Sequence, residues 1–450
     1  MKVVTVAVEY ILIGIFFLCC GLWPSTLYAA PLSLEDCVKQ AIQHSSNTLE
    51  VAARVQQFEA RLSEVESIFY PKLTATAFVA PMFTVEGDAF AFKRHWQRLS
   101  DWGPYTHLQA LLLQPIYTFG RVEAGKRASR SRIEVERARL RAAENTVALE
   151  VKKLHFSHLL ANSMIPMLTS ALESVGTALQ KASQLYEEGT GGVLLSDIMK
   201  LRYAQTEVMR YLAIAEDSAK LALAALKHTM GLMQDADLEL DLATLPKLPT
   251  ADPLTFAAAL SLASEHRPEW TQLDEGKKAA LALEEAERLA NWPVVFLAGQ
   301  LTVDWTPTRD SSPNPYQYDP YNRWVGGVAL GLQFNLDPAM ASAKAKGAEA
   351  MGAEVDALWQ FAKTGIPLQV KKAYDDMTRS RRLVDITHEG VMATRKWLTF
   401  AANAYSIGTG EAKDLLEGLM ANLQARRAYY EGVYTYFLSV AELDYAVGRP

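Results

Sequence analysis

Apolar and polar positions follow two different periods along this chain, and the changes of period mark its helices and strands. Over residues 32–70 apolar side chains recur every three or four residues without an intervening Gly or Pro. This spacing predicts one amphipathic helix that ends at Pro71. Over residues 72–85 the period falls to two, which predicts a strand.

The first strand is followed by a loop, a second strand and a very long helix. Residues 86–103 contain Gly87 and several aromatic residues, which favours a loop, and alternation returns over 105–119. Residues 121–188 are then helical in pattern, with a kink expected at Pro166. A helix of about 65 residues rises about 100 Å, which is far longer than a helix inside a compact domain. A further helical pattern runs back after it.

The second half of the chain repeats the plan of the first. Aligning the two halves brings Pro293 onto Pro71 without a gap, and each proline again precedes alternating residues. Strands are predicted over 294–305 and 325–337. The loop between them, 306–324, is rich in Pro, Tyr and Asp, as surface loops are.

A short motif marks the middle of each half. The pattern Y-x-x-G-T-G begins at Tyr186 and again at Tyr405, each time between two Ala-rich helical stretches. Glycine suits a helix C-terminus, where the chain reverses with positive φ. We therefore predict two helical hairpins, within two structural repeats of residues 31–245 and 246–450.

Residues 1–30 have the pattern of a secretory signal peptide. A positive charge lies near the start, residues 10–22 form an apolar core too short to span a bilayer, and small residues follow. A retained N-terminal anchor is the alternative. Cys19 and Cys20 lie in this segment without a clean lipidation motif, so Cys37 is the one cysteine expected in the mature chain. No internal disulfide is then available.

Charge and motifs exclude several functional classes. The 450 residues carry a formal net charge of −6 without a basic block, so we predict no nucleic-acid partner. No G-x-S-x-G, phosphate-binding loop or H-E-x-x-H motif is present, so we predict neither an enzyme nor a cofactor. His155 and His158 are spaced i, i+3, but no acidic residue or cysteine lies within a turn. They favour a surface or interhelical pair over a metal site.

Four long strands per chain restrict the architecture. In a membrane, sheet edges are not tolerated, and small single-chain barrels need at least eight strands. Three chains that shared one barrel would supply twelve strands. The alternative is a soluble protein, since alternating strands also occur in sandwiches and Ala-rich helices also form bundles.

The order of these features resembles the TolC-like outer-membrane efflux protein family. The resemblance rests on the L-x-L-E-D start at residues 32–36, Pro71 before a strand, Q-P-I-Y-T-F-G-R at 114–121, and the two Y-x-x-G tips. It implies an α+β membrane protein with long helical hairpins that form a coiled-coil tunnel. The four strands of each chain would contribute to a shared twelve-stranded trimeric barrel.

The resemblance also implies a function and partners. The homotrimer would lie in outer-membrane lipid, extend into the periplasm, and meet a periplasmic adaptor protein and an inner-membrane pump. It would be the passive exit duct of a tripartite efflux pump or type I secretion system, gated at its periplasmic tips. The alternative is a periplasmic tethering protein of coiled helices without a pore.

The resemblance further implies a constriction at the periplasmic entrance. Asp414 and Glu417 match acidic positions that ring this constriction in the family, and their spacing puts them on one helical face. Six carboxylates would converge in a trimer and attract cations. The alternative is a solvated helix start, where the macrodipole favours acidic residues.

Two other functions are implied at the tips. Tyr405 and Asp197 match a latch between neighbouring helices, although the usual basic partner is replaced by Gly410 here and Lys413 is the nearest substitute. Contact with the adaptor is implied for both turns; the alternative for these residues is turn geometry alone. The turn residues are Gly189, Thr190, Gly191, Gly408, Thr409 and Gly410.

Overall fold

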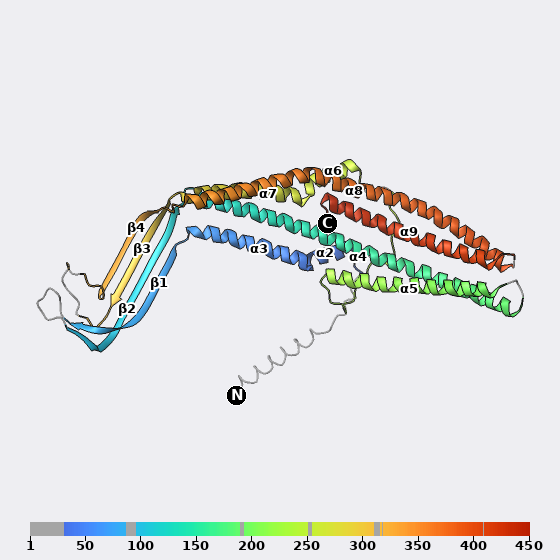
Figure 1. Ribbon diagram of the computed structural model, residues 1–450, viewed down its shortest axis with the longest axis horizontal. Coiled ribbons are helices and arrows are strands. Elements are labelled where there is room, and N and C mark those ends of the chain that lie inside the picture. Colours follow the sequence, from blue (N-terminus) through green and yellow to red (C-terminus); the bar gives the residue numbers. More distant parts are fainter. Residues whose placement is uncertain are drawn as a thin grey trace, which may run out of the picture. The chain divides into compact units, whose positions relative to one another are not determined.

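The computed structural model describes residues 31–86, 96–189, 193–250, 254–309, 316, 318–407 and 409–450. The predicted signal peptide, residues 1–30 with Cys19 and Cys20, lies outside them. The described elements follow the order helix, helix, strand, strand, helix, helix, and then the same order again (Figure 1).

The chain forms two compact units, and each draws on both predicted repeats. The first consists of the residues up to Ile42, Glu150–Leu248 and Leu383–Thr435. The second consists of Gln43–Leu149, Pro249–Arg382 and Tyr436–Pro450. The second unit contains the whole sheet.

The helix predicted over residues 32–70 is wrong, because it is broken at Ser45. The chain instead forms α2 (Leu34–His44), α3 (Ser46–Glu66) and a 3-10 turn, Ser67–Phe69. Ser45 has extended backbone angles, φ −62° and ψ 133°, and its carbonyl accepts a hydrogen bond from Thr48 Oγ1 at 2.8 Å. Ser45 is the N-cap residue of α3, a position that serine favours, and its side chain makes no capping hydrogen bond.

The same break recurs in the second half. Helix α6 (Phe256–His266) and helix α7 (Pro268–Arg288) are separated by Arg267, which is also extended, with φ −65° and ψ 123°. A second 3-10 turn, Leu289–Asn291, follows. Here the sequence carries the signal, because a residue before proline avoids the helical region.

Four long helices account for most of the chain. Helix α4 (Arg121–Glu187) has 67 residues and α8 (Pro338–Ser406) has 69. Helix α5 (Leu195–Thr229) and helix α9 (Ala412–Val447) follow them with 35 and 36 residues. A helix of 67 residues corresponds to about 100 Å of axial rise, as predicted. Over the described residues, no helix is both long enough and apolar enough to cross a membrane.

The core of the first unit joins three of these helices. Its buried residues alternate small and large side chains, which lets long helices approach closely. They are Met167, Leu168, Ala171 and Val175 of α4, Ala204, Val208 and Ala215 of α5, and Leu419 and Leu423 of α9.

The second unit holds one four-stranded antiparallel sheet in the order β1-β2-β3-β4 (Figure 1). The strands are β1 (Lys72–Glu86), β2 (Trp96–Tyr117), β3 (Val294–Trp305) and β4 (Arg323–Gln333). Strand β2 pairs with β3, so the two predicted hairpins form a single sheet. Strands β1 and β4 form its two edges.

Two predicted strand limits are corrected. Strand β2 begins at Trp96, inside the expected loop, because the strand continues through Gly103. A Cβ at Gly103 would lie 1.9 Å from Thr308 Cγ2, so this glycine permits a close approach rather than a turn. Strand β4 ends at Gln333 because its partner β3 begins at Val294, and these two residues pair.

Candidate functional site

The sheet has one strongly apolar face, and this face is exposed. Directly opposed residues on antiparallel strands share a face, so the strand register defines rows of side chains. Val328 and Trp324 are 76% and 77% exposed. The rows on this face are Leu73–Leu112–Gly299–Val328, Ala75–Ala110–Leu301–Gly326, Ala77–Leu108–Val303–Trp324 and Val79–Thr106–Trp305.

The opposite face is mostly polar. Its rows hold threonine, glutamine and ionisable side chains among small and apolar ones. They are Thr74–Leu111–Gln300–Gly327, Thr76–Gln109–Thr302–Val325 and Phe78–His107–Asp304–Arg323. A sheet with this division suits contact with lipid on one side and with water on the other.

The polar face carries a buried carboxylate at Asp304, which is 3% exposed. Its Oδ1 accepts a hydrogen bond from Tyr105 Oη at 2.6 Å and shares a second, also 2.6 Å, with His107 Nδ1. Its Oδ2 accepts a hydrogen bond from Arg323 Nε at 3.0 Å. A buried charge is tolerated when it is paired and fully hydrogen-bonded, so this network fixes β2, β3 and β4 to one another.

Sequence reasoning missed this network. The alternation placed Asp304 on the polar side of its strand, but Arg323 was assigned to the preceding loop. The missed signal was a lone acid in a strand, which needs a partner when buried. The partners come from strands that are distant in sequence, so only the register reveals them.

The second helical tip is a tight turn that needs its last glycine. Helix α8 ends at Ser406, and the amides of Thr409 and Gly410 both donate to Ala404 O at 3.0 Å. A Cβ at Gly410 would lie 2.8 Å from Ala404 Cβ and 2.9 Å from Tyr405 N. A basic residue therefore cannot stand at position 410 without shifting this turn.

The first tip is described in part. Gly189 has φ +66° directly after α4, and its amide donates to Tyr186 O at 3.2 Å. This is the left-handed ending predicted for the motif. Of the residues predicted to contact an adaptor, Thr190, Gly191 and Gly408 lie outside the described residues.

The predicted constriction residues lie in the first turns of α9. Asp414 and Glu417 are both exposed. Lys413 Nζ lies 3.9 Å from Glu417 Oε1, which is a loose, solvent-screened pair. Nothing within the described chain buries these carboxylates, so both are available to a partner or an ion.

The predicted latch residues differ in how they are held. Asp197 accepts hydrogen bonds from Leu194 N at 3.2 Å and from Lys200 Nζ at 3.3 Å, which stabilise the start of α5. The Tyr405 side chain is buried and its hydroxyl has no partner among the described residues. Burial, and then the nearby Asp197 charge, raise the pKa of Tyr405. The ammonium of Lys181 lies 5.8 Å from the Tyr405 ring centre.

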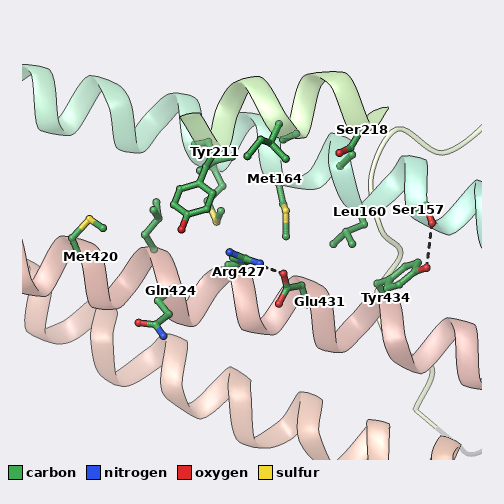
Figure 2. A pocket seen from close by; sticks show the side chains of 16 residues that line it. Ser157, Leu160, Met164, Tyr211, Ser218, Met420, Gln424, Arg427, Glu431 and Tyr434 are labelled. Atoms are coloured by element: carbon green, nitrogen blue, oxygen red, sulfur yellow. Dashed lines mark hydrogen bonds and ion pairs between the residues drawn. The ribbon is translucent and has the colours of Figure 1, made fainter. Parts of the chain in front are cut away.

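The first unit also contains a cavity of about 670 Å³ between α4, α5 and α9 (Figure 2). Its polar groups pair with each other. Arg427 Nε donates to Glu431 Oε1 at 2.7 Å, and the hydroxyls of Ser157 and Tyr434 lie 3.2 Å apart. No histidine or cysteine is among the described residues that line this cavity.

The two histidines of α4, His155 and His158, have different surroundings. His158 shares a hydrogen bond with Ala219 O of α5 at 2.9 Å, which makes it an interhelical residue. His155 is fully buried, and neither ring nitrogen has a hydrogen-bond partner in the described chain. Burial lowers the pKa of His155. No group of three or more His, Cys, Asp or Glu side chains in the described ranges is placed to hold a metal ion.

Comparison with known proteins finds similarity to outer-membrane efflux proteins. A family model described as "Outer membrane efflux protein" matches residues 37–232. This segment, which is less than half of the chain, is similar to that family. The outer membrane protein TolC of Salmonella enteritidis is 20% identical over 308 residues. That match covers 68% of this chain and 61% of TolC, which is less than two thirds of its length.

Solved structures of two bacterial outer-membrane proteins share the fold over nearly the whole chain. The outer membrane protein VceC of Vibrio cholerae has a TM-score of 0.72 at 16% identity, covering 92% of this chain and 96% of VceC. The outer membrane channel CmeC of Campylobacter jejuni has a TM-score of 0.72 at 17% identity, covering 92% and 85%. The predicted fold class, long helical hairpins with four strands per chain, is confirmed.

Proposed function

We propose that three copies of this chain form the exit duct of a tripartite efflux pump or a type I secretion system. The observation that carries this proposal is the sheet in the second unit. It has an exposed apolar face, an opposite polar face and two edge strands, β1 and β4, whose outer edges pair with no other strand among the described residues.

The two edges require partners if the apolar face meets lipid. An unpaired edge leaves backbone amides and carbonyls without hydrogen bonds, which costs several kcal/mol per group in hydrocarbon. Pairing β1 of one copy with β4 of the next closes the ladder, and three copies give twelve strands. The polar face then lines the lumen.

The helical tips would form the periplasmic entrance. Asp414 and Glu417 of three copies would converge there and attract cations, because both are exposed and on one helical face. Tyr405 and Asp197 would latch neighbouring helices, with the buried Tyr405 hydroxyl gaining a partner across the contact. Opening would be a shift between two helix packings, driven by an inner-membrane pump through a periplasmic adaptor that contacts Gly189, Thr409 and Gly410 together with Thr190, Gly191 and Gly408.

The alternative, a periplasmic tether without a pore, does not explain the sheet. A tether would not need a large exposed apolar face beside a polar one. The family model that matches residues 37–232 is described as an outer membrane efflux protein, which supports an efflux duct over a tether.

Two neighbouring residues of β3 test the proposal. Leu301 faces the apolar side and Gln300 the polar side. We expect Leu301→Lys to abolish assembly in the outer membrane, because a lysine facing lipid costs about 2–4 kcal/mol per copy at mid-depth. We expect Gln300→Lys to assemble normally. The measurement is the amount of trimer in detergent extracts of the outer membrane. Equal assembly of the two variants would contradict the proposal.

A further inference from the structure

One row of the polar face crosses all four strands and contains an acidic and a basic side chain, a histidine and a phenylalanine. Phe78 of β1 opposes His107 of β2, which opposes Asp304 of β3, which opposes Arg323 of β4. The rings of Phe78 and His107 are stacked with centres 4.8 Å apart. The row is therefore continuous from one edge of the sheet to the other.

The chain that follows β3 lies over this row. The ring of Tyr321 packs edge-on against Tyr105 at 5.8 Å, and the Arg309 guanidinium lies 3.9 Å from the Tyr321 ring centre. Asp319 Oδ1 accepts hydrogen bonds from Tyr321 N at 2.9 Å and Asn322 N at 3.3 Å, which fixes the turn that presents Tyr321. This segment therefore packs against Tyr105, whose hydroxyl donates a hydrogen bond to Asp304 of the row.

We propose that Asp304 and Arg323 form a charge-balanced ring, which keeps the duct from selecting between cations and anions at this level. The inference rests on the proposed function, because a threefold barrel repeats the row three times around its lumen. Asp304 and Arg323 cancel each other in the intact ring. Removing one partner leaves three like charges around the lumen, where fixed charges act on passing ions.

A purely structural clamp is the competing explanation, since Asp304 also joins three strands. A clamp and a charge ring differ in one observable. If Asp304 and Arg323 only join the strands, removing either one lowers stability without shifting the ion selectivity of the duct. The ring predicts opposite changes in selectivity for the two partners.

The experiment uses the full-length protein in planar bilayers with a KCl gradient. The background is Asp414→Ala with Glu417→Ala, so that the proposed entrance carboxylates do not dominate. We expect Asp304→Asn to lower the K⁺/Cl⁻ permeability ratio by about twofold or more, and Arg323→Gln to raise it by a similar factor. Tyr105→Phe removes one hydrogen bond to Asp304 without changing charge, so its reversal potential should match the background.

The possible outcomes separate the two proposals. Conducting variants with unchanged reversal potentials would overturn the charge ring and leave the duct intact. A background protein that forms no pore would overturn the duct itself, and the ring with it. If the Asp304→Asn protein fails to assemble, the Arg323→Gln variant alone tests the ring. In that variant Asp304 keeps Tyr105 and His107 as hydrogen-bond partners, so we expect it to assemble.

Discussion

The carboxylates of the sheet and those of the helical tip are held in opposite ways. Asp304 is buried, with partners on two neighbouring strands. Asp414 and Glu417 are exposed on one helix, with a single loose partner four residues away. A carboxylate that is buried and paired stabilises the fold of its own chain. An exposed carboxylate with at most a loose partner is available for contact with another chain or with ions.

The largest expected effect comes from breaking the buried network. Replacing Asp304 by Ala leaves Arg323, His107 and Tyr105 without their common acceptor. We expect the free energy of unfolding to fall by at least about 2 kcal/mol per chain, because an uncompensated buried charge is costly. Urea unfolding in detergent measures it. The matched control is Gln300→Ala, on the same face of β3, which should cost far less. Equal losses would show that Asp304 is no more than a surface residue.

A second prediction concerns pH. Burial lowers the pKa of His155. The imidazole therefore binds a proton less readily in the folded protein than in the unfolded chain. Stability is therefore full above the ordinary histidine pKa of about 6.5 and falls as the pH drops below it, by up to about 1.4 kcal/mol per pH unit. Thermal midpoints between pH 7.5 and 5 measure the slope.

One variant sharpens the pH prediction. His155→Phe should flatten the slope, because phenylalanine fills the buried position without a group that binds a proton. A slope that persists unchanged in His155→Phe would assign the acid sensitivity to another group.

A third, smaller effect is expected at the tip. Tyr405→Phe removes a buried hydroxyl without a partner in the described chain, so the folding stability of the isolated chain should change by no more than about 1 kcal/mol. If Tyr405 latches neighbouring helices in the trimer, the same variant should nevertheless raise the conductance of the closed duct. Unchanged conductance would limit Tyr405 to packing.

The smallest effect on stability is expected from the exposed carboxylates. The double variant Asp414→Ala, Glu417→Ala should leave the thermal midpoint unchanged, because solvent screens both groups. Its conductance and its block by multivalent cations should change, since three copies lose six carboxylates together. Retention of cation block in the double variant would remove these residues from the constriction.

The sequence predicted those parts of the molecule that depend on local pattern. The limits of β3 follow from the alternation of side chains after Pro293, as predicted. The limits of α4 follow from its helical period and from the glycine after the helix. The break at Ser45 and the start of β2 at Trp96 were missed, because a serine capping one helix and a glycine beneath Thr308 look like ordinary helix and loop residues. The Asp304 network depends on strand register between distant segments, which no local period contains.

Electron microscopy of the detergent-extracted protein tests the central claim most directly. The account predicts a threefold particle with twelve strands at one end, in which β1 of each copy pairs with β4 of the next. Asp304 and Arg323 should face the lumen, and Leu301 and Trp324 should face the detergent. A monomer or dimer without a closed barrel, or a barrel with the Leu301 face turned inward, would contradict it.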